Sequence, residues 1–156
     1  MTIRPTDLGL LILRAVLGAV FIAHGSQKLF GWFGGDGLSA EADSMAERGL
    51  EPAELMAVLA GVSEFGGGLL ILLGLLTPLG ALALAIVMVV ATATDTGQNG
   101  FFIQNEGFEY NLVLFTICAA FLLAGAGAYS LDRTLSSRAP RLRTLLRQAP
   151  EAEPSR

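Results

Sequence analysis

Residues 53–94 read AELMAVLAGVSEFGGGLLILLGLLTPLGALALAIVMVVATAT, two apolar runs that only Thr77 and Pro78 separate. A helix needs about 20 mostly apolar residues to cross a hydrocarbon core about 30 Å thick. Proline ends a preceding helix and fits the first turn of the next one. The stretch therefore predicts a tight antiparallel hairpin of two membrane-spanning helices, over about residues 53–76 and 79–94.

Two further apolar segments flank this hairpin, at about residues 8–33 and 109–127. The 156 residues are 53% hydrophobic and only 15% charged, whereas soluble domains carry about 25% charged residues. This composition excludes intrinsic disorder and argues against a soluble enzyme. We predict an all-α integral membrane protein, a four-helix bundle in which residues 1–132 form one membrane domain.

The charges outside the predicted spans are segregated. Residues 34–52 contain five acidic side chains against Arg48 alone, and residues 95–108 contain no Lys or Arg. Arginines dominate after Asp132, at Arg133, Arg138, Arg141, Arg143, Arg147 and Arg156. By the positive-inside rule, we expect both termini in the cytoplasm and both acidic loops outside. The expected location is the cytoplasmic (inner) membrane, with residues 133–156 as a basic, partly disordered cytoplasmic tail.

A charged side chain inside a bilayer is costly and faces the bundle interior. At 1.5 Å per residue, Arg14 lies roughly 9 Å from the inner end of its span, and Glu64 roughly 16 Å from the outer end of the next. We predict that they form a buried ion pair between antiparallel helices. The pair either joins the two helices or belongs to a ligand or proton site near the midplane.

Polar side chains also gather toward the outer ends of the spans. His24 and Lys28 are four residues apart and share a helix face. The candidate pocket consists of His24, Gln27, Lys28, Glu64, Asp95, Glu109 and Tyr110, with Arg14 in support. Such a pocket suits a quinone headgroup, an anion or a proton relay. The simpler alternative is that Lys28 only extends to the membrane interface.

Metal and thiol chemistry are limited by composition. The chain has one histidine, His24, and one cysteine, Cys118, which lies in an apolar run. A single cysteine forms neither an intrachain disulfide nor a CxxC pair, and one histidine cannot supply both axial ligands of a haem. We predict no metal site and no covalent cofactor.

A short helix is expected near residues 40–48, ended by Gly49.

Four ordered motifs resemble the DoxX family of small bacterial membrane proteins, between Leu8 and Asp132. They are His24-Gly25 with Lys28 and Gly31-Trp32-Phe33; Glu64 with Gly66-Gly67-Gly68 and Gly74-Leu75; Asn99-Gly100-Phe101-Phe102 with Glu109-Tyr110; and Gly125-x-Gly127 with Tyr129-Ser130-Leu131-Asp132. Two positions depart from the family pattern. Thr94 and Asp95 stand where members often have a histidine, and Ala126 replaces the usual proline. The first departure argues against a two-histidine metal or haem site.

The resemblance implies a four-helix membrane protein whose relatives include a subunit of thiosulfate oxidation with quinone as acceptor and membrane partners of oxidative-stress proteins. Three hypotheses follow. The chain is a redox-associated subunit that binds quinone and works with a soluble redox partner; or a non-enzymatic scaffold that anchors a soluble protein; or a small-molecule carrier or receptor, which would need a homo-oligomer. Whether it is an enzyme stays open, and we expect a lipid but no nucleic-acid partner.

Overall fold

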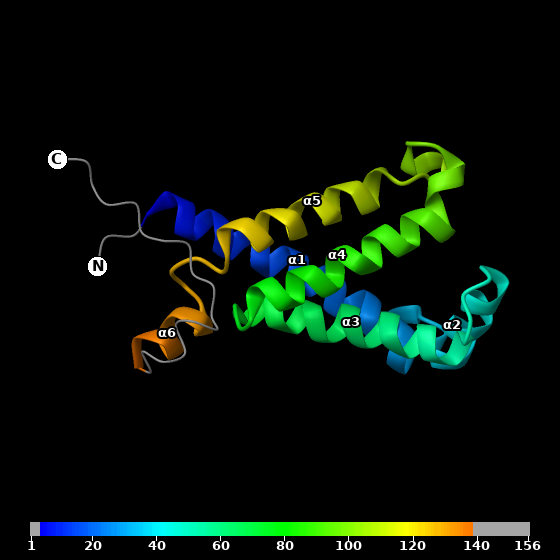
Figure 1. Cartoon of the computed structure of the whole chain (residues 1–156), viewed down its shortest axis with the longest axis horizontal. Helices are drawn as coiled ribbons and strands as arrows, with labels where there is room; N and C mark the ends of the chain where they lie inside the picture. The colour runs from blue at the N-terminus through cyan, green and yellow to red at the C-terminus, as the bar shows by residue number, and fades with distance from the viewer. Residues whose placement is uncertain (1–3, 139–156) are drawn as a thin grey trace.

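The computed structural model describes residues 4–138, and all of its regular elements are helices (Figure 1). This confirms the predicted all-α class. The α-helices are α1 Pro5–Phe30, α2 Gly37–Glu47, α3 Ala53–Leu73, α4 Thr77–Thr94, α5 Glu109–Ala124 and α6 Leu131–Arg138. Three short 3-10 helices lie in the connections: η1 Trp32–Gly34, η2 Thr96–Asn99 and η3 Ile103–Asn105.

Three helices are long and apolar enough to cross a membrane. They are α1, α3 and α4, with 26, 21 and 18 residues. The fourth apolar helix, α5, has 16 residues, so it rises about 24 Å against a core of about 30 Å. Several membrane spans are therefore present, while the count of four crossings and the orientation of the termini stay predictions.

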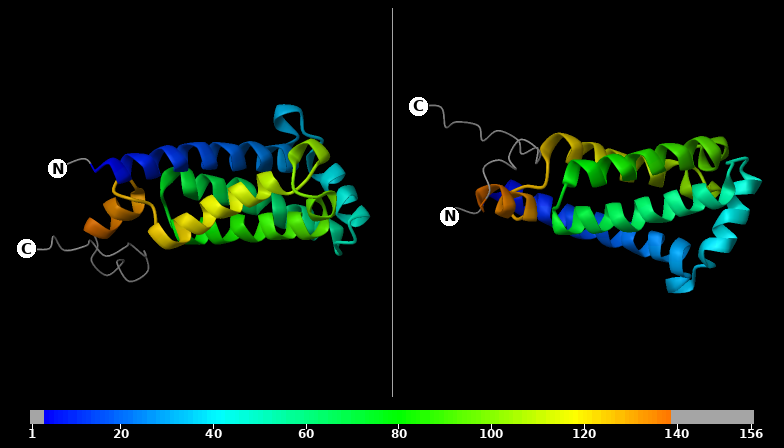
Figure 2. Two further views of the ribbon diagram at one scale, coloured as in Figure 1. Left: turned by 90° about the horizontal axis from the view of Figure 1, so that it is seen from above. Right: turned by 60° about the horizontal axis from the view of Figure 1, so that its bottom comes forward.

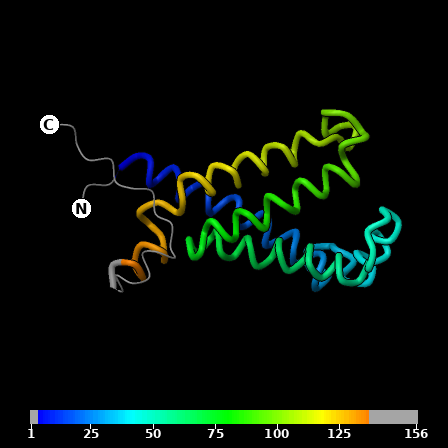
Figure 3. Tube along the Cα trace, viewed as in Figure 1, coloured from blue at the N-terminus to red at the C-terminus, as the bar shows by residue number. Residues whose placement is uncertain are grey.

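The four long helices run alongside one another, and α3 packs between α1 and α4 (Figure 2). Helix α5 packs mainly on α4. The short helix α2 lies across one end of the bundle, against α3 and α1, and α6 lies at the opposite end, near the start of α1 (Figure 3). We call these the α2 end and the α6 end. The predicted loop helix near residues 40–48 is confirmed as α2.

The closest helix contact is between α1 and α3, and glycines make it possible. Gly18 lies against Gly68 and Leu72, and Gly25 lies against the backbone of Phe65, with no room for a Cβ atom at either glycine. Small residues allow this approach between helices in membranes. The two contacts fix the antiparallel register, so early residues of α1 face late residues of α3.

The predicted hairpin is confirmed with slightly shifted bounds. Helix α3 ends at Leu73, and Gly74 takes the left-handed conformation (φ 64°) that glycine adopts without strain. Helix α4 begins at Thr77 with Pro78 in its first turn, where the missing proline N–H is tolerated. Most of the predicted tail, including the arginine-rich residues 141–147, lies outside the described residues.

Candidate functional site

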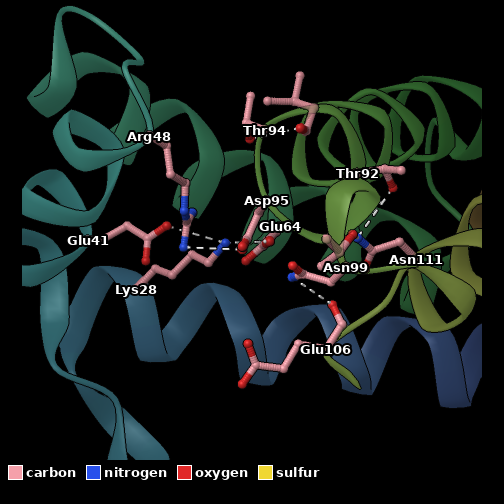
Figure 4. Close-up of polar contacts among 12 residues, drawn as sticks. Lys28, Glu41, Arg48, Glu64, Thr92, Thr94, Asp95, Asn99, Glu106 and Asn111 are labelled. Atoms are coloured by element: carbon pink, nitrogen blue, oxygen red, sulfur yellow. Dashed lines mark hydrogen bonds and ion pairs between the residues drawn. The ribbon is translucent and has the colours of Figure 1, made fainter. Parts of the chain in front are cut away.

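A partly buried ionic cluster at the α2 end joins three helices. Lys28 of α1 donates a hydrogen bond to Glu64 Oε1 of α3 at 2.8 Å, and its Nζ lies 3.6 Å from Glu41 Oε1 of α2 (Figure 4). We call Lys28, Glu41 and Glu64 the Lys28 cluster. Two carboxylates share one ammonium, so the ionised cluster carries one negative charge.

Two carboxylate oxygens of this cluster lack donors. Glu64 is 3% exposed, and its Oε2 accepts no hydrogen bond from any described residue. Glu41 Oε1 is buried as well, and the Lys28 ammonium lies beyond hydrogen-bond distance from it. A buried acceptor without a donor costs free energy, about 1–3 kcal/mol. Both oxygens are enclosed by the protein, and Glu41 Oε1 is held in the ion pair with Lys28.

A polar cavity opens beside the cluster. Its volume is about 330 Å³, and we call it the α2 cavity. The wall is formed by Gln27, Lys28, Gly34, Gly35, Asp36, Gly37, Ala40, Glu41 and Ser44. Glu64 stands behind Lys28 and holds its ammonium group in place. A cavity of this size accommodates a small ring compound.

Exposed aromatic rings lie next to the cavity. Trp32 and Phe33 of η1 are 55% and 72% exposed, and Phe30 is half exposed. Phe30 contacts Trp32 and Phe65, with ring centroids 4.9 and 5.6 Å apart. The aromatic residues do not line the cavity, but Gly34 of the cavity wall belongs to the same 3-10 helix as Trp32 and Phe33. This combination fits an amphipathic ligand with a polar head and an apolar tail.

Arg14 is not the partner of Glu64, so the predicted Arg14–Glu64 pair is wrong. The guanidinium group donates to four backbone carbonyl oxygens: Ile71 and Leu72 of α3 at 2.9 Å each, Ala126 at 2.9 Å and Tyr129 at 2.7 Å. Arg14 lies early in α1 and faces the end of α3, whereas Glu64 faces Lys28. Arg14 caps the carbonyl end of α3 at the α6 end, far along the bundle from the Lys28 cluster.

The residues 125–132, which we call the closing segment, are bound to the helix ends around Arg14. Asp132 accepts hydrogen bonds from the amides of Leu76 (2.8 Å) and Thr77 (3.2 Å) at the start of α4. The Ala128 amide donates to Asp7 of α1 at 2.8 Å. The closing segment thus has a structural role, which joins α1, α3 and α4.

Of three further candidate residues, one lines the cavity and two do not. Gln27 lines the α2 cavity and donates to the Phe33 carbonyl at 3.3 Å. His24 is exposed one turn before Lys28. Asp95 instead forms an ion pair with Arg48 at 3.5 Å (Figure 4).

Two further candidate residues, Glu109 and Tyr110, lie at the start of α5, after the loop that follows α4. Glu109 accepts a hydrogen bond from the Ile103 amide at 2.7 Å and so holds that loop. Tyr110 is 39% exposed on α5. Neither residue lines the α2 cavity.

The sequence interpretation did not include Glu41, which lines the cavity. The spacing of residues in the predicted loop helix could have indicated it. Glu41 lies four residues before the apolar Met45, so the two share a helix face, and Met45 is buried in the structure. The face that buries the methionine also turns Glu41 toward the bundle. Among residues 4–138, no group of three or more His, Cys, Asp and Glu side chains is placed to hold a metal ion.

The family model of DoxX matches residues 9–97, from α1 to η2. The chain belongs to the DoxX family. The matched segment contains the whole Lys28 cluster, and the closing segment lies beyond it. No solved structure shows a significant match to this DoxX protein.

Two of the similar curated proteins are membrane proteins by name. An uncharacterised membrane protein of Mycobacterium tuberculosis is 36% identical, over 81% of this chain and 81% of its own length. The inner membrane protein YqjF of Escherichia coli is 33% identical, over 85% and 95%. A Bacillus subtilis protein named "Putative oxidoreductase CatD" is 29% identical, over 83% and 88%. These similarities support a membrane location for this DoxX protein.

Proposed function

We propose that this DoxX protein is a redox-associated membrane subunit that binds the headgroup of a quinone in the α2 cavity. The observation that carries the proposal is the Lys28 cluster, of which Lys28 and Glu41 line a cavity of about 330 Å³. Lys28 donates one hydrogen bond to Glu64, and the remaining N–H groups of its ammonium can bond a ligand oxygen. The aromatic rings of Phe30, Trp32 and Phe33 would receive the apolar part of the molecule.

Charge favours a neutral ligand over an anion. The cavity wall carries Lys28, Asp36 and Glu41, and Glu64 stands directly behind it. When all four are ionised, three negative charges face one positive charge, so an anionic ligand would be repelled. A quinone headgroup is neutral, and its carbonyl oxygens accept hydrogen bonds from Lys28 and Gln27.

The roles of the other candidate residues follow from their contacts. Glu64 positions Lys28 through the hydrogen bond that it accepts, and His24 lies one helical turn before Lys28 on α1. Arg14 and Glu109 serve the scaffold, since their polar atoms bond backbone groups elsewhere. Electrons would be exchanged with a soluble redox partner, because the chemistry of hydride and electron transfer belongs to redox cofactors.

The proposed topology has four crossings in the bacterial cytoplasmic membrane, with both termini in the cytoplasm. Segregation of charge supports it, since residues 34–52 are acidic and the arginines follow Asp132. The α2 end, with the cavity and the exposed Trp32, would then lie at the outer interface. Tryptophan is enriched at that level of a membrane, where quinone headgroups can be reached laterally.

The test is binding by the purified full-length protein in lipid nanodiscs. Decylubiquinone is added, and bound ligand is measured by equilibrium separation of the nanodiscs against empty ones. We expect saturable binding to the wild type that Lys28→Met weakens at least tenfold, because about 1.5–3 kcal/mol is lost with a hydrogen bond from a charged group.

The matched control is Arg48→Met, which removes a cation at the same end of the bundle without touching the cavity wall. It should bind decylubiquinone as the wild type does. Binding no greater than to empty nanodiscs would refute the proposal and favour the scaffold hypothesis. Equal weakening by both substitutions would show a general effect of surface charge.

A further inference from the structure

A second hollow lies between α4 and α5, toward the α2 end. Its volume is about 350 Å³, and we call it the α4–α5 groove. Met88 of its wall is buried, whereas Val89, Leu112 and Phe115 are 54%, 44% and 37% exposed, so the groove can be reached from outside the protein. Met88 lies about 9 Å from the end of α4 at Thr94. Because α4 is long and apolar enough to cross a membrane, hydrocarbon chains would surround this part of the helix.

The polar side chains of the groove bond to their own neighbours. Thr92 donates to the Met88 carbonyl at 2.8 Å. The Asn111 amide donates to the hydroxyl oxygens of Thr96 and Thr92 at 3.0 and 3.4 Å (Figure 4). The other residues that line the groove are apolar. Since the donors are used within the protein, the groove suits a hydrocarbon chain.

The loop before α5 continues the apolar surface of the groove. Phe108 of the groove wall contacts Phe101, which in turn contacts Phe102, with ring centroids 5.5 and 5.3 Å apart. Phe101 and Phe102 are both exposed. The amides of Phe108 and Glu109 donate to the carbonyls of Gly100 and Phe101 at 3.1 and 2.9 Å, which holds the rings at the start of α5. An exposed apolar surface of this kind marks contact with a membrane.

Charge beside the groove favours one class of lipid headgroup. Residues 95–109 contain Asp95, Glu106 and Glu109 and no Lys or Arg. Asp95 is paired with Arg48, whereas Glu106 is exposed and lies two residues before Phe108 of the groove wall. An anionic headgroup would be repelled here, and a headgroup that carries an ammonium group would be attracted.

We propose that the α4–α5 groove binds a phospholipid with an ammonium headgroup, of the phosphatidylethanolamine type, in preference to an anionic phospholipid. One acyl chain lies in the groove against Val89, Leu112 and Phe115, and the ammonium group faces the carboxylates of Glu106 and Glu109. This site is separate from the α2 cavity, with which it shares no lining residue. The proposal does not depend on quinone binding.

The chain offers matched variants for the acyl chain and for the headgroup. Ala93→Phe fills the groove from an exposed position of its wall, and Ala120→Phe makes the same change at an exposed position of α5 outside the wall. Glu106→Gln removes a carboxylate beside the groove. Glu54→Gln makes that change at an exposed position in the first turn of α3.

The experiment uses full-length protein released from nanodiscs that contain equal amounts of palmitoyl-oleoyl phosphatidylethanolamine and palmitoyl-oleoyl phosphatidylglycerol. Native mass spectrometry identifies the phospholipid that stays bound. We expect the wild type to retain phosphatidylethanolamine with a preference of about threefold, as an exposed ion pair provides. Ala93→Phe should lose the lipid and Ala120→Phe should keep it. Glu106→Gln should lower the preference to about half, and Glu54→Gln should leave it unchanged.

Each of the other outcomes overturns a stated part of the proposal. No retained lipid in the wild type, or equal retention by Ala93→Phe and Ala120→Phe, would refute the site. Equal retention of the two phospholipids by the wild type would refute the headgroup preference. A dimer without lipid that Ala93→Phe alone dissociates would show that a second copy occupies the groove instead. The wild-type measurement needs no variant, so misfolding of Ala93→Phe cannot rescue the proposal.

Discussion

Arg14 brings a full positive charge into the bundle, and all four of its hydrogen bonds end on backbone carbonyl oxygens. Two of these carbonyls belong to the last turn of α3 and two to the closing segment. Helix carbonyl ends carry partial negative charge, so a buried cation there is stabilised. One side chain therefore holds together a helix terminus and a loop more than 100 residues away along the chain.

Substitution of Arg14 should destabilise the whole domain. Arg14→Gln leaves at least two buried carbonyls without donors, so we expect a loss of about 3 kcal/mol. The measurement is thermal unfolding in detergent, followed by circular dichroism. Arg4→Gln, at an exposed position before α1, is the matched control and should unfold as the wild type does. Similar midpoints for Arg14→Gln and Arg4→Gln would show that the four contacts contribute nothing measurable.

Lys28 is the only lysine of the chain, which makes its environment measurable chemically. Its hydrogen bond to Glu64 holds the ammonium group against α3. We expect slow acylation of Lys28 by an amine-reactive ester in the wild type, and roughly tenfold faster acylation in Glu64→Ala, since a hydrogen bond to a charged group is lost. Mass spectrometry of the Lys28 peptide gives the rate.

The control for this labelling is Glu54→Ala, an exposed carboxylate in the first turn of α3. It should leave the acylation rate at the wild-type value. If Glu64→Ala reacts no faster than Glu54→Ala, then Glu64 does not hold Lys28 in solution. The result is independent of any ligand and so tests the cluster itself.

At the scale of elements, the start of α4 depends on a residue far away in sequence. Leu76 and Thr77 present free amides where the helix begins, and the Asp132 carboxylate accepts from both. This is the capping interaction that Ser, Thr, Asn or Asp usually supplies from within the same turn. Here the cap comes from α6, so it joins the α3–α4 hairpin to the closing segment.

Loss of this cap should weaken the α6 end. We expect Asp132→Ala to cost about 1–2 kcal/mol of stability, and Asp132→Asn less, because the amide retains one acceptor oxygen. Thermal unfolding in detergent gives the order wild type, Asp132→Asn, Asp132→Ala. Asp43→Ala, an exposed aspartate of α2, controls for charge. An Asp132→Ala midpoint equal to that of Asp43→Ala would contradict the capping role.

Elements were more predictable from the sequence than side-chain partners. Apolar runs predicted α1, α3 and α4 because burial in lipid demands continuous hydrophobicity, and Gly49 marked the end of the loop helix. The partners of Arg14 were not predictable, since backbone carbonyls leave no sequence signature, whether at the end of α3 or in the closing segment. The pairing of Lys28 with Glu64 follows from the antiparallel register, which Gly18 and Gly25 fix only in three dimensions.

At the scale of the whole molecule, the helix pairs differ in how they are held. Helices α1 and α3 are joined by glycine contacts, the Lys28 cluster and Arg14, whereas α5 rests mainly on α4 (Figure 2). The polar contacts concentrate at the two ends of the bundle, and the middle is packed by apolar side chains such as Leu17, Phe21 and Leu84. The proposed ligand site therefore lies at the α2 end. The two residues whose substitution is expected to lower the stability of the domain, Arg14 and Asp132, lie at the α6 end.

The number of crossings determines on which side of the membrane the α2 end and the α6 end lie. Helix α5, with 16 residues, is the shortest of the four helices predicted to cross. The test labels single cysteines with a membrane-impermeant maleimide on spheroplasts. Ser39→Cys reports on α2, Leu135→Cys reports on α6, and both positions are exposed. The native Cys118 is fully buried and serves as the unreactive background.

Four crossings with both termini inside place the two positions on opposite sides of the membrane. We expect Ser39→Cys to react on intact spheroplasts and Leu135→Cys to react only after permeabilisation. If α5 did not cross, three spans would bring both positions to the outer side, and both would react without permeabilisation. A helix rising about 24 Å can cross where the bilayer thins or flanking residues extend to the interface, so the opposite-side result is the one expected.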